Sequence, residues 1–356
     1  MTDRPHAHAS PAGVPADPGR TRIFSVRRRL ALTLSGFGCL ALVSLVVAPL
    51  IGPTPIALGR VFDSAIPFAD NVDAQIFFIA RLPRALAGML VGASLAVAGV
   101  VFQALLRNPL ATPFTLGVSA GASLGAMLVI TFGLPMAVAG IPAVPVASLI
   151  GSLAAAGVVY AMATLRRHGL STTVLLLACV TLNSFFSAII MFVQYSADFA
   201  KTFQTVRWLM GNLDVSSFQP IVAALPLMGT AFVMFATLPR ALNLLTLGSD
   251  NAAARGVDVL RTQRVAFLSA SLATGAAVSL SGPIGFIGIV IPHLVRLLVG
   301  ADHRIVMPAS ACLGAAFLVA CDVVARTAMA PVELPVGVIT ALTGGPFFLW
   351  LLMRRP

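Results

Sequence analysis

Long apolar stretches recur along this chain, and each is long enough to cross a lipid bilayer as a helix. A transmembrane helix needs about 20 predominantly apolar residues. Only 10% of the 356 residues are charged, against about 25% in a soluble domain. The sequence therefore predicts an all-α polytopic membrane protein of about ten transmembrane helices. The expected spans lie near residues 30–51, 83–106, 113–133, 142–165, 172–196, 219–238, 265–281, 284–300, 307–326 and 335–353.

The basic residues indicate how the chain is oriented. If the first span begins in the cytoplasm, seventeen of the 23 Lys and Arg residues fall on the cytoplasmic side and six on the outer side. Cytoplasmic loops of membrane proteins carry such an excess. We therefore expect a multi-pass protein of the plasma (inner) membrane with both termini in the cytoplasm. The formal charge of +11 is then explained by the membrane boundaries, and no nucleic-acid partner is expected.

Two regions are expected along the chain. Residues 1–29 lack apolar periodicity and predict a disordered cytoplasmic tail, and residues 30–356 form the transmembrane domain. The outer segment 197–218 is expected to form a short interfacial helix. The cytoplasmic insert 239–264 is expected to hold a short Ala-rich helix capped by Ser249 or Asp250, a stop at Gly256, and a second short helix.

The sequence lacks the motifs of an enzyme. A nucleotide-binding P-loop needs GxxxxGK[ST], and the only lysine, Lys201, stands in no such motif. The four cysteines are scattered singly through apolar runs, so we expect no metal site. We predict no catalytic residue and no cofactor in this chain. If ATP and Mg²⁺ drive its activity, a partner chain must bind them.

Three of the arginines on the outer side, where bases are few, lie at or beside the ends of expected spans: Arg81, Arg84 and Arg326. A single arginine there is equally well explained by snorkelling to lipid head groups. Three together favour an acidic partner, because a guanidinium can clamp a carboxylate with two hydrogen bonds. Asp322 lies four residues before Arg326, a spacing that predicts a structural ion pair within one helix.

Several motifs together resemble one family. They are RLPR (81–84), QALLRNPLATP (103–113), GPIGFIGIVIPHLVRLLVGADHR (282–304), CDVVAR (321–326) and ELPVGVITALTGGPFF (333–348). From about residue 30 onward the chain resembles the permease subunits of type II ABC importers for iron-siderophore complexes, haem and cobalamin. The resemblance implies two ten-helix permease chains around a central pathway. It also implies two ATPase subunits on the inside and a substrate-binding protein on the outside.

The resemblance also implies roles for individual residues. Arg81, Arg84 and Arg326 would dock the binding protein. Coupling to the ATPase would fall to Gly248, Ser249, Asp250, Ala253, Arg255, Gly256 and Val257. The cytoplasmic gate would comprise Asn108, Leu110, Ser171, Thr172 and Thr173.

The expected function is the import of an iron(III)-siderophore, with haem and cobalamin as open alternatives. The second permease is either another copy of this chain or a homologue. A proton- or sodium-coupled secondary transporter is the alternative class. The insert 239–264 distinguishes the two classes, because a secondary transporter needs no docking helix for a motor.

Overall fold

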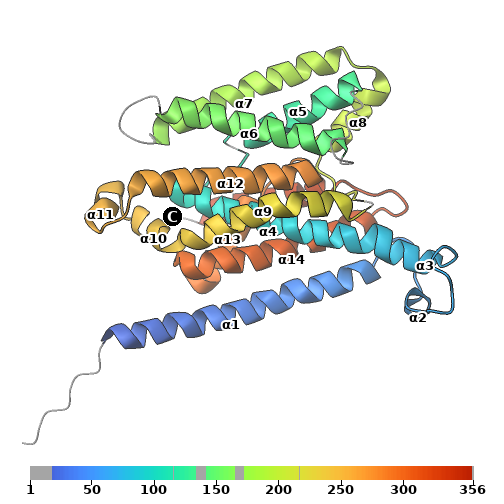
Figure 1. The fold of residues 1–356 in the computed structure, drawn as a ribbon, viewed down its shortest axis with the longest axis horizontal. Coiled ribbons are helices and arrows are strands. Elements are labelled where there is room, and N and C mark those ends of the chain that lie inside the picture. The colour runs from blue at the N-terminus through green and yellow to red at the C-terminus, as the bar shows by residue number, and fades with distance from the viewer. Residues whose placement is uncertain (1–17, 115, 134–141, 165–171, 216, 355–356) are drawn as a thin grey trace, which may run out of the picture.

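The computed structural model describes residues 18–114, 116–133, 142–164, 172–215 and 217–354, and these residues fold into helices without a β-strand (Figure 1). Seven helical segments in this part are long and apolar enough to cross a membrane, and three shorter apolar helices accompany them. This confirms the predicted all-α class. The ten helices are α1 (Pro18–Val47), α4 (Leu82–Leu106), α5 (Val118–Phe132), α6 (Ala143–Thr164), α7 (Thr172–Tyr195), α9 (Gln219–Thr237), α12 (Val259–Ser281), α13 (Ile287–Val299), α14 (His303–Thr327) and α15 (Val336–Arg354).

Short helices fill the connections at the two ends of the bundle. One end carries η1 (Ala48–Leu50), α2 (Leu58–Val61), α3 (Val72–Gln75), the π-helical segment η2 (Ile76–Arg81) and α8 (Phe199–Leu209). The opposite end carries α10 (Pro239–Leu245) and α11 (Ser249–Ala254), as Figure 1 shows. The helix α8 lies where the sequence predicted an interfacial helix.

Three local features differ from the sequence prediction. The helix α1 begins at Pro18, inside the expected disordered tail. Gly248, and not Ser249 or Asp250, occupies the position before α11. The second short helix is absent, because Asp258 caps a helix that continues unbroken from Val259 to Ser281. Its Oδ1 accepts the backbone N–H of Arg261.

The helix α4 lies at the centre of the core and is packed by α12, α13 and α14. Glycines allow this close packing. A Cβ on Gly99 would lie 2.1 Å from the Gly288 carbonyl oxygen, and one on Gly92 would lie 2.2 Å from the Gly314 oxygen. Small residues at helix crossings let backbones approach to contact. Helices α5, α6 and α7 form a layer on one side of this core, and α1 lies along the other (Figure 1).

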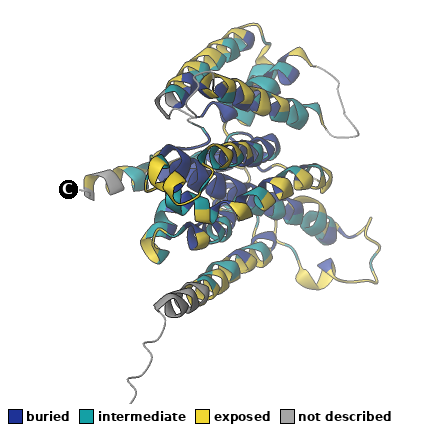
Figure 2. Cartoon of the chain, turned by 60° about the vertical axis from the view of Figure 1, so that its left-hand side comes forward, coloured by how far each residue is buried: buried dark blue, intermediate teal, exposed yellow. Residues whose placement is uncertain are grey.

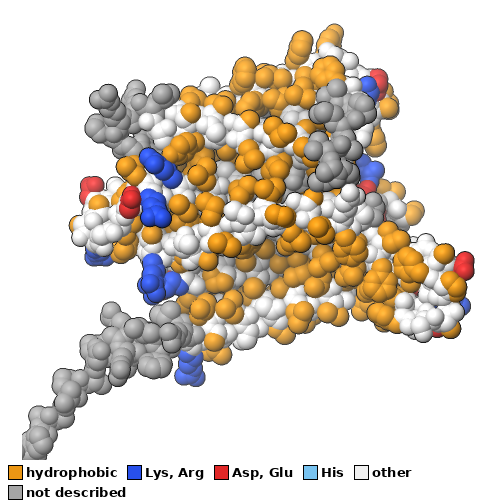
Figure 3. Space-filling view, viewed as in Figure 1, with side chains coloured by type: hydrophobic (Ala, Val, Ile, Leu, Met, Phe, Trp, Pro, Cys, Tyr) orange, Lys and Arg blue, Asp and Glu red, His pale blue; other side chains and the backbone are white. Residues whose placement is uncertain are grey.

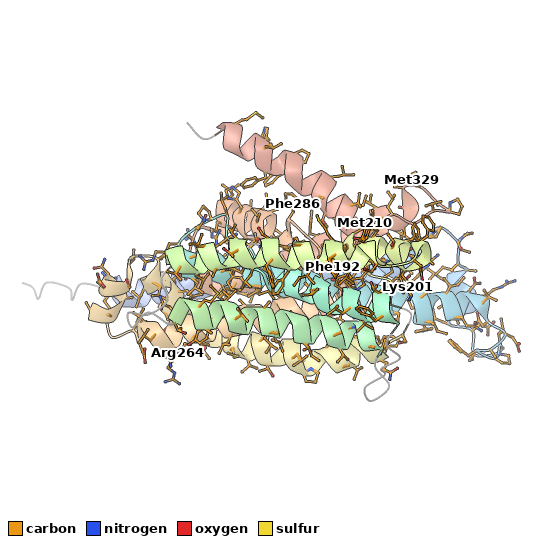
Figure 4. All side chains as sticks on the ribbon, turned by 90° about the horizontal axis from the view of Figure 1, so that it is seen from above. Phe192, Lys201, Met210, Arg264, Phe286 and Met329 are labelled. Atoms are coloured by element: carbon orange, nitrogen blue, oxygen red, sulfur yellow. The ribbon has the colours of Figure 1, made fainter. Side chains whose placement is uncertain are left out.

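The surface matches a protein surrounded by lipid. Exposed residues follow the outward faces of the helices (Figure 2). Hydrophobic side chains cover the face between the two ends, and Lys and Arg gather at the end that carries α11 (Figure 3). Lys201 and Arg264 lie toward opposite ends of the bundle (Figure 4).

Candidate functional site

A cluster of charged groups joins α4 and α14 at the end of the bundle that carries α2 and α3. The Arg84 Nε donates to Asp322 Oδ1 at 2.8 Å, and the Arg84 Nη1 donates to Glu333 Oε2 at 2.6 Å. Asp322 also lies 3.8 Å from the Arg326 Nε. The predicted pair between Asp322 and Arg326 is therefore the longer of two contacts, and Arg84 is the closer partner.

The other two arginines hold the segment that follows α1. The Arg81 guanidinium donates to the carbonyl oxygens of Pro49, Leu50 and Thr54. The Arg326 Nη2 donates to the Ala48 oxygen at 2.6 Å. Ala48 and Pro49 of η1 are buried, so these guanidiniums supply the hydrogen-bond partners that the carbonyl groups need at a helix end.

All three arginines are buried, with exposed fractions of 5%, 7% and 3% for Arg81, Arg84 and Arg326. The sequence reasoning treated them as surface groups that wait for a partner protein, whereas each already contacts carboxylates or carbonyls of its own chain. Glu333 is the accessible member of the cluster, with 41% of its side chain exposed. The Arg84 Nη2 is buried with no acceptor among the described residues.

At the opposite end, α10 and α11 form a compact projection. Leu242, Leu245 and Ala252 are buried against the core. The Asn251 side-chain amide donates to the Leu247 carbonyl at 2.8 Å, which ties α11 to the end of α10. Gly256 has a φ of +81°, a conformation that favours glycine, and it ends the projection.

The predicted coupling residues lie on this projection. Only Ala252 of α11 faces the core, whereas four of the predicted residues are exposed: Asp250, Ala253, Arg255 and Gly256. Gly248, Ser249 and Val257 are half-buried. The projection therefore presents a small, mostly uncovered surface at the basic end of the bundle.

The predicted gate is described only in part. Asn108 follows α4, and its Oδ1 accepts the backbone N–H of Leu110 at 2.9 Å, so that Leu110 is 45% exposed at the tip of a tight turn. Thr172 and Thr173 begin α7. The remaining gate residue, Ser171, lies outside the described residues.

Two separate groups of hydrogen-bonded side chains lie between the projection and the Asn108 turn. On one side, the Asn243 amide of α10 donates to Asp302 Oδ1 at 2.7 Å, and its oxygen accepts the His303 backbone N–H at 2.9 Å. On the other side, the Arg296 Nη1 donates to Gln103 Oε1 at 2.6 Å. A cavity of about 350 Å³ borders both sides, lined by Gln103, Asn108, Thr246, Arg296 and His303 among others.

A second cavity of about 400 Å³ opens between α5 and α7. Its polar lining consists of hydroxyl and amide groups, and no charged side chain of the described residues borders it. These groups belong to Ser119, Ser123, Asn183, Ser187 and Gln194. Asn183, Ser187 and Gln194 are spaced so that they share one face of α7.

Sequence reasoning also missed Glu333, Asn243, Gln103 and Arg296 as members of these networks. The partners are far apart in the chain: Gln103 and Arg296 are separated by 193 positions, and Arg84 and Glu333 by 249. A charged residue within an apolar span was the available signal for Arg296.

Comparison with known proteins agrees with these features of the described residues: ten apolar helices, a charged cluster at one end of the bundle and a helical projection at the opposite end. Residues 40–354 match the FecCD transport family. The chain belongs to the FecCD transport family. It is 45% identical over 301 residues to the cobalamin import system permease protein BtuC of Halobacterium salinarum, which covers 84% of this chain and 79% of that protein. It is 40% identical over 284 residues to the hemin transport system permease protein HmuU of Yersinia pestis, which covers 79% of this chain and 84% of that one.

A solved structure supports the same conclusion for the fold. It is assigned to the metal-chelate type of ABC transporter, in an inward-facing conformation, and has a TM-score of 0.76 and 31% identity to this chain. The match covers 92% of this chain and all of the solved one. This FecCD member is thus an ABC importer permease of the membrane, and the alternative of an ion-coupled secondary transporter is not supported.

Proposed function

We propose that this permease imports an iron(III)-siderophore. The uncharged cavity between α5 and α7 supports this choice, because its hydroxyls and amides can hydrogen-bond the polar rim of a bulky chelate without requiring one particular charge. The metal-chelate type of the solved neighbour agrees with it. The test is uptake into vesicles that hold the complete transporter, with a radiolabelled ferric siderophore, haem and cobalamin offered separately. Faster uptake of haem or cobalamin than of the ferric chelate would overturn this choice.

The energy source proposed here lies on other chains. The sequence contains no P-loop, so two ATPase subunits would bind ATP and Mg²⁺ at the α11 end, which we place in the cytoplasm together with both termini. We base this assignment on the exposed surface of α11. A short helix anchored in the core through Ala252 can transmit movement from the ATPase to the bundle and from the bundle to the ATPase. A second permease, identical or homologous, completes the pathway.

A single substitution tests the coupling assignment. Ala253 is exposed on α11, so Ala253→Arg leaves the permease folded but places a long charged side chain in the proposed ATPase contact. Co-purification of the ATPase and ATP-driven uptake should both be lost. Met353→Arg, at an exposed position near the end of α15, is the matched control and should retain both. Normal assembly of the Ala253→Arg complex would remove α11 from the contact.

We propose that the charged cluster of Arg84, Asp322, Arg326 and Glu333 lies on the outer side of the membrane and docks the binding protein. Because Arg81, Arg84 and Arg326 are buried, we infer that a carboxylate of the partner reaches Arg84 by replacing Glu333, the exposed member of the cluster. The buried Arg84 Nη2, which has no acceptor among the described residues, can then complete a two-hydrogen-bond clamp. Arg81 and Arg326 hold the adjacent η1 segment in position.

The gate is proposed to lie at Asn108 and Leu110, together with Ser171, Thr172 and Thr173 of the facing helix start. The Asn108 turn supports this, since it presents Leu110 to the cytoplasmic end as an exposed apolar tip. The proposed connection from α11 to this turn consists of two hydrogen-bonded groups that border the same cavity. One group is Asn243, Asp302 and His303, and the other is Arg296 and Gln103.

A further inference from the structure

An apolar groove of about 400 Å³ runs between α1, α9 and α14 at the end that carries α11. Its lining follows one face of each helix, with Phe232, Phe235, Ala236 and Pro239 from α9 and its end, and Met307, Pro308, Ala311 and Cys312 from α14. Leu34 of α1 closes one side and Val97 of α4 forms the floor. The groove lies apart from the charged outer cluster, from α11 and from the uncharged cavity.

The shape of the groove fits a hydrocarbon chain. The stretch of α14 from Arg304 to Cys312 rises about 12 Å, close to the depth of one leaflet, which is about half of the 30 Å hydrocarbon core. Only 6% of the membrane window of α1 is buried, so most of this helix faces the bilayer, and the groove opens toward the bilayer between α1 and α9. At that depth the groove is in contact with the acyl chains of lipids and not with water.

The positive charge at one end of the groove indicates which kind of lipid head group would bind there. Arg304 lines the groove at its α11 end and is exposed. No ion pair of its guanidinium occurs within the described residues. The neighbouring acid, Asp302, accepts hydrogen bonds from the Asn243 amide and from the Arg304 backbone N–H. A second exposed arginine, Arg240, directly follows the groove residue Pro239.

We propose that this groove binds an anionic phospholipid of the leaflet at the α11 end, with one acyl chain between α9 and α14 and the phosphate on Arg304. Basic residues beside an apolar cleft between membrane helices are a recognised arrangement for anionic head groups. A lipid bound there fills the gap between α1 and the body, and so supports the contact of α1 with α14. The site requires only the membrane, and does not depend on which substrate the transporter carries.

The test uses fluorescence quenching by lipids with brominated acyl chains. Phe232→Trp places a reporter in the groove, in a chain that also carries Trp208→Phe and Trp350→Phe. The purified protein is placed in vesicles of phosphatidylcholine with increasing brominated phosphatidylglycerol, or with brominated phosphatidylcholine instead. The expected result is half-maximal quenching at a mole fraction about fivefold lower for the anionic lipid, the effect of one arginine near the surface.

Two variants in this background separate the site from general surface charge. Arg304→Gln should make the two lipids equal. Arg264→Gln, which removes an exposed arginine that points away from the bundle (Figure 4), should preserve the preference. Ala311→Phe should fill the groove and reduce quenching by both lipids.

Native mass spectrometry of the unmodified chain gives an independent measurement if the reporter variant does not fold. Retained phosphatidylglycerol on the wild type and its loss in Arg304→Gln would agree with the proposal. Equal quenching by the two lipids before Arg304 is changed, an equal loss in Arg264→Gln, or no quenching at all because protein covers the groove would each overturn it.

Discussion

Arg84 on α4 and Asp322 on α14 form a buried ion pair, with the Arg84 Nε 2.8 Å from Asp322 Oδ1 and side-chain exposures of 9% and 3%. The residues are 238 positions apart. This contact therefore joins a helix from the first third of the chain to a helix near its C-terminal end. Removing one member leaves the other charge desolvated, which costs far more than an exposed pair would.

We therefore expect Arg84→Met to lower the free energy of unfolding by about 3–5 kcal/mol. Thermal unfolding in detergent measures this, and adding Asp322→Asn should recover part of the loss, because Asp322 would otherwise keep only its longer contact with Arg326. Arg207→Met is the control, since its pair with Asp214 is exposed on both sides and should contribute about 0–1 kcal/mol. Equal losses for Arg84→Met and Arg207→Met would show that burial does not matter here.

Glu333→Gln should strengthen docking of the binding protein. The change removes the carboxylate 2.6 Å from Arg84 and so frees that guanidinium for an acidic partner. The expected gain is about two- to fivefold in affinity, as for a partly exposed pair, and it should shrink as salt is added. Surface plasmon resonance with the cognate binding protein measures both. Weaker docking would mean that Glu333 itself contacts the partner.

Gly99→Ala should severely destabilise the bundle. Its Cβ would lie 2.1 Å from the Gly288 carbonyl oxygen, a backbone atom that cannot move without separating α4 from α13. We expect a loss of at least about 3 kcal/mol, above the usual range for single substitutions. Gly229→Ala is the matched control, because no atom lies within 4 Å of its added Cβ, and it should be neutral or slightly stabilising.

The sequence was sufficient to predict the helices, because each apolar run is a strong and local signal. It could also place Arg81, Arg84 and Arg326 near one end of the bundle, because they stand at the ends of these apolar runs. It could not show that these guanidiniums are buried, since that depends on Asp322, Glu333 and the carbonyls after α1, which arrive from distant parts of the chain. The cap of α11 was mispredicted because Ser249 and Asp250 are better caps than Gly248 by propensity, whereas the φ of +115° at Gly248 requires glycine.

Asn243→Ala should uncouple ATP hydrolysis from transport. Asn243 joins α10 to Asp302 and His303, so its loss should disconnect α11 from the gate while leaving the exposed ATPase contact intact. The expected outcome is normal co-purification of the ATPase, with several times more ATP hydrolysed per substrate molecule imported. Asn243→Asp, which keeps an acceptor oxygen for His303 but places a second carboxylate against Asp302, should uncouple at least as strongly because like charges repel. An unchanged ratio in Asn243→Ala would exclude this route of coupling.

Leu110→Cys should crosslink across the dimer in a way that depends on the nucleotide state. Leu110 is exposed at the tip of the Asn108 turn, and a gate there must separate when it opens. Crosslinking yield with a short bifunctional reagent, compared with and without ATP, measures the change. Leu260→Cys, exposed on α12 outside the turn, controls for general reactivity. A yield that is the same in every state would place the gate elsewhere.

The anchoring of α1 has a consequence for how the protein is made. The carbonyl of Ala48 is held by Arg326, which is synthesised 278 residues later. For most of translation, α1 must therefore stay in the bilayer without α14, the helix that it contacts most extensively. It is also the most apolar of the seven long helical segments, so it can stay in the bilayer before its later partner is made. By contrast, the least apolar of the seven, α12, is 78% buried in its membrane window, and it depends on neighbours that precede it in the chain. The order of the helices along the chain thus allows the self-sufficient span to enter the bilayer first, and the dependent one to enter when its partners are already there.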